Sequence, residues 1–422
     1  MSAAQSIPTP HVVSPQERRK PMPELTRTPA SVPELAALLA PRLPDILDLA
    51  TRLTEVESGS FLPAGVDRVS DLVAERLAAL GFTSRRHTIA SGRGRAFEAT
   101  LETGSPGLRL LVLGHADTVW PEGATADWPI VTNAPTMSGP GLGDMKCALA
   151  MAVHAIEAAL ETAVPGVASI TYALVPDEEL GSVDSRGWLA DLGRRTDVCL
   201  ALEAGLVDGG VIVSRGAVGA MIITAHGRTA HCTDDTGASA LRALAPLVEE
   251  LESVTDRAQR TICSVGILRS GTARQVVPDQ AELHVDLRAP GDAAGQALVA
   301  EIRRRAEARA VDGVRIEISG GITRPALSRS VTDPVYALAE ELAAAGGSEL
   351  RPVAEMGGSD ASLVGKFAPL VLDGLGPTAF DQCSRAETVV RDSVVPRTAL
   401  LAALIGHAGR LAAHLPNGKD HR

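Results

Sequence analysis

Three short apolar runs in the first half of the chain each end close to a residue with a metal-binding or catalytic side chain. The runs span residues 108–113, 169–175 and 198–202. Nearly continuous apolar runs of this length predict strands that are buried on both faces, as in a parallel sheet. His115, the acidic run that begins at Asp177, and Glu203 follow these strands. Because ligands gather at the carboxyl ends of parallel strands, we expect these side chains to share one edge of a sheet.

Apolar residues at helical spacing predict helices between and around these strands. The predicted helices span residues 32–54, 69–80, 145–159 and 398–411, and Pro41 and Pro44 interrupt the first of them. Alternation of strands and helices is typical of a mostly parallel sheet with helices packed against it. We therefore predict an α/β fold for most of the chain.

The pattern changes in the middle of the chain, where the strands are farther apart. Strands are predicted at residues 220–225, 280–287 and 314–318, and helices at 238–251 and 294–306. At 422 residues the chain exceeds the roughly 100–200 residues of a typical domain, so a second, inserted α+β domain is expected. The predicted organisation is a flexible leader (1–30), an inserted smaller domain (216–322), and a catalytic domain in two parts (31–215 and 323–422).

Composition restricts the partners and the compartment. The formal net charge is -11, and no stripe of Lys and Arg with interleaved aromatic residues is present, so we expect no nucleic-acid partner. The five cysteines are an odd number without CxxC spacing, which favours the cytoplasm. Charges or prolines interrupt each apolar run before it reaches the roughly 18 residues of a membrane span, so no membrane association is expected. The leader lacks the apolar segment of a signal peptide.

The polar residues at the strand ends match the requirements of a catalytic zinc site. Such a site needs nitrogen and oxygen ligands, an open position for water, and a base for the proton of that water. His115 is a candidate ligand, and Asp117 is placed to accept a hydrogen bond from its second ring nitrogen. Glu178 and Glu179 are adjacent, so one can bind metal while the other acts as general base. A solvated acidic loop is the alternative for this pair.

Two further carboxylates extend the candidate site. Asp144 follows a Gly-Pro-Gly-Leu-Gly turn and precedes a predicted helix, where it is either a metal ligand or a helix N-cap. Glu203 emerges from an apolar strand, and a carboxylate in such surroundings needs a partner.

The order of these segments resembles the family of co-catalytic zinc metallopeptidases that includes glutamate carboxypeptidase, aminoacylase and N-acetylornithine deacetylase. The matching stretches are Gly-His-Ala-Asp-Thr-Val at 114–119, Gly-Pro-Gly-Leu-Gly-Asp-Met-Lys at 139–146, Asp-Glu-Glu-Leu-Gly-Ser at 177–182 and Leu-Glu at 202–203. The similarity spans residues 35–411, and four concordant motifs in one order are more specific than any one of them. The resemblance implies a zinc-peptidase catalytic domain with an inserted lid domain that forms homodimers.

The resemblance also implies roles for the candidate residues. His115 and Glu203 would hold one zinc, Asp144 would bridge two zinc ions, and Glu179 would hold the second. Glu178 would activate the shared water.

Within the inserted domain, His231 would stabilise the tetrahedral oxyanion, often in the active site of a partner subunit. Arg288 would bind the carboxylate of a small-molecule substrate, since guanidinium pairs bidentately with carboxylate. Gln275 stands in the same substrate region, where the family commonly has asparagine. Gly358 and Ser359 belong to a loop that lies near the substrate, where glycine permits close approach of the backbone.

One position departs from the family pattern. The second zinc normally receives a histidine from a late loop, a few residues before a glutamate that corresponds to Glu387, and no histidine stands there. Gln382 and Cys383 are the two candidate replacements, and Asp381 is a third donor. A thiolate is an excellent zinc ligand and a neutral amide is a poor one. The alternative is that Cys383 is a small buried apolar residue and the second zinc is lost.

The leading hypothesis is a zinc-dependent hydrolase, with one or two zinc ions per chain, that cuts an amide bond of an N-acyl amino acid or small peptide. The second hypothesis is a non-catalytic or altered family member that binds a carboxylated ligand with one zinc or none. A purely structural dimer subunit is a third, weaker reading.

Overall fold

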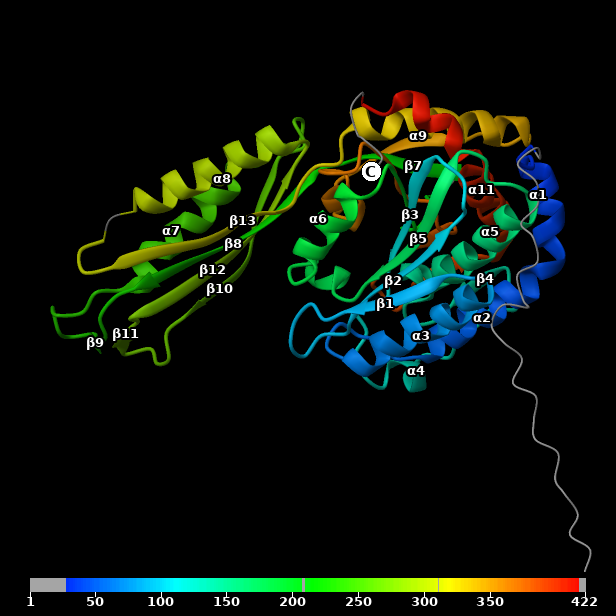
Figure 1. Ribbon diagram of the computed structural model, residues 1–422. Helices are drawn as coiled ribbons and strands as arrows, with labels where there is room; N and C mark the ends of the chain where they lie inside the picture. The colour runs from blue at the N-terminus through cyan, green and yellow to red at the C-terminus, as the bar shows by residue number, and fades with distance from the viewer. Residues whose placement is uncertain (1–27, 207–208, 310, 417–422) are drawn as a thin grey trace, which may run out of the picture.

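The computed structural model describes residues 28–206, 209–309 and 311–416, and two bodies are visible in it (Figure 1). All but residues 28–30 of the predicted leader lie outside these ranges. The larger body holds a six-stranded sheet of order β1-β2-β5-β3-β6-β15. Its strands are β1 (Thr83–His87), β2 (Ala96–Glu102), β5 (Val167–Val175), β3 (Leu108–His115), β6 (Val198–Ala201) and β15 (Leu370–Leu372). Strands β5, β3, β6 and β15 run parallel to one another, which confirms a mostly parallel sheet.

The central strand β3 is buried on both faces, as its apolar run predicts. Leu110 and Val112 join one hydrophobic core, while Leu111 and Leu113 join another on the opposite face. This alternation follows from the two-residue period of a strand. Helices therefore cover both faces, and the polar chemistry is left to the strand ends.

Helices from both halves of the chain build these two layers. The first core packs α1 (Val32–Leu39), α2 (Leu43–Glu55), α3 (Pro63–Ala79), α5 (Cys147–Thr162), α9 (Arg329–Ala345) and α11 (Val394–His407) together with one face of the sheet. The second core packs α6 (Arg186–Arg194) and α10 (Asp360–Val364) on the other face. The short helix η2 (Ala40–Arg42) separates α1 from α2 at the predicted proline interruption. No helix in the described ranges is long and apolar enough to cross a membrane.

Short strands and helices complete the larger body. Strand β7 (Gly210–Arg215) pairs with β14 (Arg351–Glu355), and β16 (Ala379–Phe380), β17 (Thr388–Val390) and β4 (Thr136–Ser138) form a small sheet. The remaining turns are α4 (Ala124–Asp127), η3 (Leu142–Lys146), η4 (Glu178–Leu180), η6 (Arg391–Ser393) and η7 (Ala408–His414).

The smaller body, which we call the lid, spans residues 217–324 and projects from the larger one (Figure 1). It is an antiparallel sheet of order β10-β12-β8-β13. Its elements are β8 (Ala217–His226), β9 (Ala230–His231), α7 (Ala240–Glu252), β10 (Ile262–Ser270), β11 (Val276–Val277), β12 (Gln280–Ala289), α8 (Asp292–Glu307) and β13 (Arg315–Arg324). Helices α7 and α8 share a core with the sheet. Strands β9 and β11 lie at the tip farthest from the larger body (Figure 1).

The lid has its own hydrophobic core, so its stability can be tested separately. Leu244 on α7 is fully buried, whereas Leu241 on the same helix is 36% exposed. We expect Leu244→Ala to destabilise the lid by about 2–5 kcal/mol, because it removes buried methyl groups and leaves a cavity. Leu241→Ala should stay within about 0.5 kcal/mol of the parent chain. Urea unfolding, monitored by hydrogen exchange of the α7 amides, measures the change in stability of both variants. Equal effects of the two substitutions would contradict this core assignment.

Candidate metal centre

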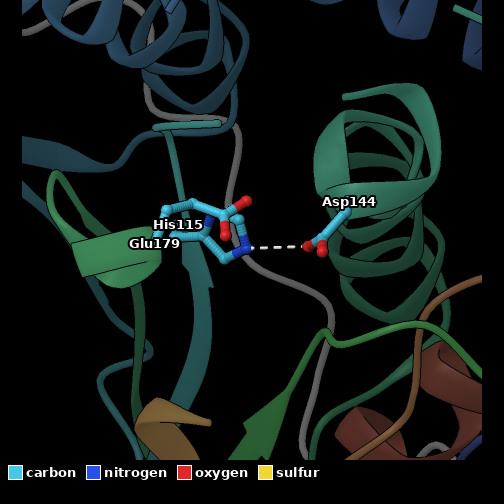
Figure 2. A group of neighbouring side chains, drawn as sticks. All are labelled: His115, Asp144 and Glu179. Atoms are coloured by element: carbon cyan, nitrogen blue, oxygen red, sulfur yellow. Dashed lines mark hydrogen bonds and ion pairs between the residues drawn. The ribbon is translucent and has the colours of Figure 1, made fainter. Parts of the chain in front are cut away.

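His115, Asp144 and Glu179 converge at the carboxyl end of the central sheet (Figure 2). One ligand atom from each residue lies within 4.8 Å of the others. His115 ends β3 and is 2% exposed, and its Nε2 lies 3.0 Å from Oδ1 of Asp144. Asp144 lies in η3 before α5, and the helix N-cap is Lys146, so the N-cap alternative for Asp144 is wrong. The three donors come from different elements and meet only in the folded chain.

Asp117 is the hub of hydrogen bonds behind these donors. Its carboxylate accepts hydrogen bonds from Ser60 Oγ at 2.7 Å and from the backbone N–H groups of Glu178 and Glu179 at 3.1 and 3.2 Å. His115 Nδ1 lies 3.0 Å from the backbone oxygen of Asp117 and 3.5 Å from its Oδ1. The nearer partner of the ring is thus the carbonyl, not the carboxylate that the sequence indicated. The carboxylate instead fixes the turn that carries the two glutamates.

Glu387 fixes the turn that carries Asp144. Its Oε1 accepts hydrogen bonds from the backbone N–H groups of Gly143 at 2.6 Å and Asp144 at 3.3 Å. Gly141 begins this turn with φ 74°, in the left-handed region that favours glycine. A carboxylate 243 residues away along the chain therefore sets the position of a candidate ligand.

The clustered carboxyl groups disfavour one another's ionisation. Desolvation, followed by the charge of Asp144, raises the pKa of Glu179 to about 9. The same two causes raise the pKa of Glu203 well above its ordinary value. Desolvation raises the pKa of Glu178 to about 7, although Arg324 opposes that change. Crowded, desolvated carboxylates of this kind are stabilised by a nearby cation.

The donor set fits a divalent metal. Oε1 of Glu179 is buried and has no hydrogen-bond partner among the described residues. An orphaned carboxylate oxygen beside an imidazole and a second carboxylate matches the nitrogen and oxygen ligands that zinc takes. Glu203 follows β6, and the charges of Asp144 and Glu178 raise the pKa of its carboxyl, but Glu203 is not one of the three residues whose donor atoms lie within 4.8 Å of one another.

Arg324 contacts Glu178, a feature that no sequence motif indicated. Its Nη2 lies 2.7 Å from Oε1 of Glu178 and also donates to the backbone oxygen of Glu178. A side-chain carbon at Gly358 would lie 2.6 Å from Cδ of Arg324. Glycine at that position is what allows Arg324 to pass. The only sequence signal was an arginine at the end of the lid, and position alone did not distinguish it from a surface residue.

The loop that contains Gly358 and Ser359 is held by a second buried ion pair. Arg215 Nε lies 2.7 Å from Oδ2 of Asp373, and both side chains are buried. Arg215 Nη1 also donates to the backbone oxygen of Gly357 at 3.2 Å. Ser359 is 1% exposed and caps α10 by accepting a hydrogen bond from Ala361 N. Gly358 therefore packs against Arg324, which contacts Glu178. Ser359 caps a helix instead.

The predicted site residues of the lid do not join this cluster within one chain. His231 is exposed on β9, and its Nδ1 lies 2.7 Å from Thr233 Oγ1. The backbone oxygen of Gln275 accepts a hydrogen bond from Cys232 N at 2.9 Å, which ties Gln275 to the tip of the lid. Arg288 on β12 forms hydrogen bonds with Asp286 at 2.8 and 3.0 Å. It also reaches the backbone oxygen of Met356 at 3.4 Å, beside the glycine loop.

Cys383 lies at the metal group and is solvent-exposed, so the alternative that it is a buried apolar residue is wrong. Its Sγ is 3.5 Å from Oδ2 of Asp144 and 3.9 Å from Oε2 of Glu179. Although the residue is exposed, partial desolvation of its thiol, followed by the charges of Glu179 and Asp144, raises the pKa of Cys383. Its backbone has φ 59°, which is uncommon for a residue other than glycine.

A family model for peptidase family M20/M25/M40 matches residues 111–407, which is more than half of the chain. The chain therefore belongs to this family. This finding confirms the predicted relationship to zinc peptidases and deacylases, and at this level the prediction of an enzyme that acts on amide bonds.

Curated relatives cover most of the chain at low identity. Carboxypeptidase G2 of a Pseudomonas species is 24% identical over 369 residues, which is 85% of this chain and 88% of that protein. Succinyl-diaminopimelate desuccinylase of Methylorubrum populi is 28% identical over 331 residues, 72% of this chain and 84% of that protein.

Solved structures share the fold. Aminopeptidase PepT from Bacillus cereus aligns with a TM-score of 0.71 at 19% identity, covering 86% of this chain and 98% of that one. A dinuclear metal-binding peptidase of the M20 family from Bacillus subtilis aligns with a TM-score of 0.64 at 16% identity, covering 87% and 98%. At these identities the likeness shows the fold alone, and it confirms the predicted fold class.

The hub role of Asp117 gives a testable consequence. In Asp117→Asn one oxygen acceptor becomes an N–H donor that faces backbone N–H groups, so the glutamate turn should lose its position. We expect metal affinity to fall by about 10–100-fold, measured by titration of the metal-depleted protein. Asp67→Asn is the matched control, because Asp67 also accepts a backbone N–H, from Arg95, away from the metal group. Retention of parent metal affinity by Asp117→Asn would refute the hub role.

Proposed function

We propose that this family member is a zinc-dependent hydrolase that cuts the amide bond of an N-acyl amino acid or a small peptide, as a carboxypeptidase or deacylase does. The observation that carries the proposal is Glu178, a desolvated carboxyl beside the metal group with its pKa raised to about 7. Relatives named as a carboxypeptidase and a desuccinylase support the reaction class. The related structure described as dinuclear and metal-binding supports the cofactor.

In this proposal the metal ligands divide between two zinc positions. His115 and Glu203 would hold one ion, Glu179 would hold the other, and Asp144 would contribute to both. Bound zinc supplies a Lewis acid that polarises the scissile carbonyl and acidifies water. The hydrogen bonds that Asp117 and Glu387 accept from the backbone N–H groups of Glu179 and Asp144 keep these ligands in place before metal arrives.

Glu178 acts as the general base. A carboxyl whose pKa lies near neutrality can take a proton from water and return it to the leaving nitrogen, since both steps then run near balance. Arg324 holds Oε1 of Glu178 at 2.7 Å, which fixes the orientation of the base. A purely ligand-binding protein would have no use for this base, so the non-catalytic alternative is not favoured.

The substrate carboxylate is assigned to Arg288, beside the loop that contains Gly358 and Ser359. Arg288 pairs its guanidinium with the Asp286 carboxylate through two hydrogen bonds, and a substrate carboxylate would replace Asp286 in the same bidentate arrangement. His231 is the oxyanion donor, and we infer that it acts in the site of a partner in a homodimer. Gln275 lies with His231 at the tip of the lid, so we infer that it too acts in the site of a partner subunit. The five free cysteines support a cytoplasmic location.

Glu178→Gln tests the base directly. The amide is nearly isosteric with the carboxyl but cannot take the proton, so we expect kcat to fall by about 10²–10⁴-fold. Zinc content should stay that of the parent chain. Hydrolysis of a panel of N-acyl amino acids and dipeptides measures the first quantity, and elemental analysis measures the second.

Glu122→Gln is the control for this substitution, because Glu122 is exposed. It should hydrolyse the panel at the parent rate. If Glu178→Gln keeps the parent rate on a substrate that the parent chain cuts, the assignment of the base is wrong.

Mixed dimers test whether His231 serves a partner. His231→Ala and Glu178→Gln chains should each be inactive alone. A hybrid dimer of the two has one site with both residues intact, so mixing under subunit exchange should restore activity. Two His231→Ala preparations mixed in the same way provide the control. Failure of the hybrid to gain activity, with exchange verified by mass spectrometry, would contradict action in a partner site.

A further inference from the structure

Cys383 stands where a ligand of the metal group would stand. Its Sγ approaches two oxygens that belong to different residues of that group, at 3.5 Å from Asp144 Oδ2 and 3.9 Å from Glu179 Oε2. The other oxygen of Glu179, Oε1, is buried without a partner among the described residues. The cysteine therefore lies beside a group of donors whose chemistry suits a cation.

The spacing of these atoms matches a coordination sphere. Zinc binds sulfur at about 2.3 Å and carboxylate oxygen at about 2.0 Å, so a sulfur and an oxygen on one tetrahedral ion lie about 3.5 Å apart. The two observed separations, 3.5 and 3.9 Å, are close to this value. Each separation taken alone is also that of a thiol hydrogen bond, whereas one ion shared by the three side chains accounts for both together.

We propose that the thiolate of Cys383, together with Asp144 and Glu179, binds the second divalent cation of this site, with zinc as the preferred ion. The inference rests on the proposed function only in assuming a two-metal site. The S–H bond breaks as the zinc–sulfur bond forms, and the proton leaves to solvent, so the step needs no oxidant or reductant. Gln382 then serves as a neighbour of the ligand and not as the ligand.

A thiolate changes the character of the site. It is a soft ligand that favours zinc over magnesium or manganese. It also brings a negative charge that a neutral imidazole lacks, which adds to the carboxylates already present. The second position should therefore discriminate strongly for zinc.

Cobalt substitution tests the ligand by a readout other than activity. The full-length protein is depleted of metal, loaded with Co²⁺, and examined for the near-ultraviolet charge-transfer band that a cobalt–thiolate bond produces. We expect the band in the parent chain and in Cys232→Ser, and no band in Cys383→Ser. Cys232 is the matched control because it is the other exposed cysteine of the chain. No band in the cobalt-loaded parent chain, or a band that persists in Cys383→Ser, overturns the proposal.

Zinc content provides a second measurement on the same variants. Cys383→Ser should lose about one zinc per chain, since hydroxyl is a poor ligand. Cys383→His should recover that zinc without the cobalt band, because imidazole replaces the thiolate. Parent zinc content in Cys383→Ser overturns the proposal. A Cys383-dependent band in a protein that cuts nothing in the panel would refute the hydrolase and leave the ligand standing. Hydrolysis without the band would support the hydrolase and refute Cys383 as a ligand.

Discussion

The structure depends on keeping several carboxylates together at one edge of a sheet, where burial and the charge of Asp144 raise the pKa values of the glutamates around it. Desolvation and the charge of Asp144 raise the pKa values of Glu179 and Glu203, so the folded chain stores an electrostatic cost that a divalent cation offsets. Packing of two hydrophobic cores against β3 holds the strand ends in place against this repulsion. The grouping of these possible metal-binding residues is therefore a consequence of the fold, because they come from segments that are far apart in the sequence.

Hydrogen bonds, more than packing, determine where each donor points. Asp117 receives the backbone N–H groups of the glutamate turn, and Glu387 receives those of the Asp144 turn. Both are carboxylates that bind backbone N–H groups beside the metal group. A carboxylate that accepts two backbone N–H groups fixes the geometry of the turn that carries them, so the ligands are preorganised. Asp117 and Glu387 thus fix the turns, and the side chains of the metal group are left to bind metal.

The sequence predicted the parts of this arrangement that depend on local pattern. Strands β3, β5 and β6 were predicted because strands buried on both faces leave a continuous apolar signal. Strand β10 was missed because it is an exposed edge strand with an irregular register between Val265 and Ile267. Arg324 was missed for a different reason: its contact with Glu178 joins residues 146 positions apart, and nothing in the local pattern records that distance. The placement of Arg288 and His231 depends on the lid. The sequence predicted most helices and strands of the lid but not its position relative to the larger body.

The attachment of the lid explains why its residues differ in their relation to the site. The chain enters through β8 and returns through β13, and Arg324 pairs with Val218, so both connections lie side by side at the base of the lid. Arg324 sits at that base, where it contacts Glu178. His231 lies on β9 at the opposite end of the lid, away from that contact. The lid residue that contacts Glu178 and the lid residue that we propose as oxyanion donor therefore lie at opposite ends of the lid.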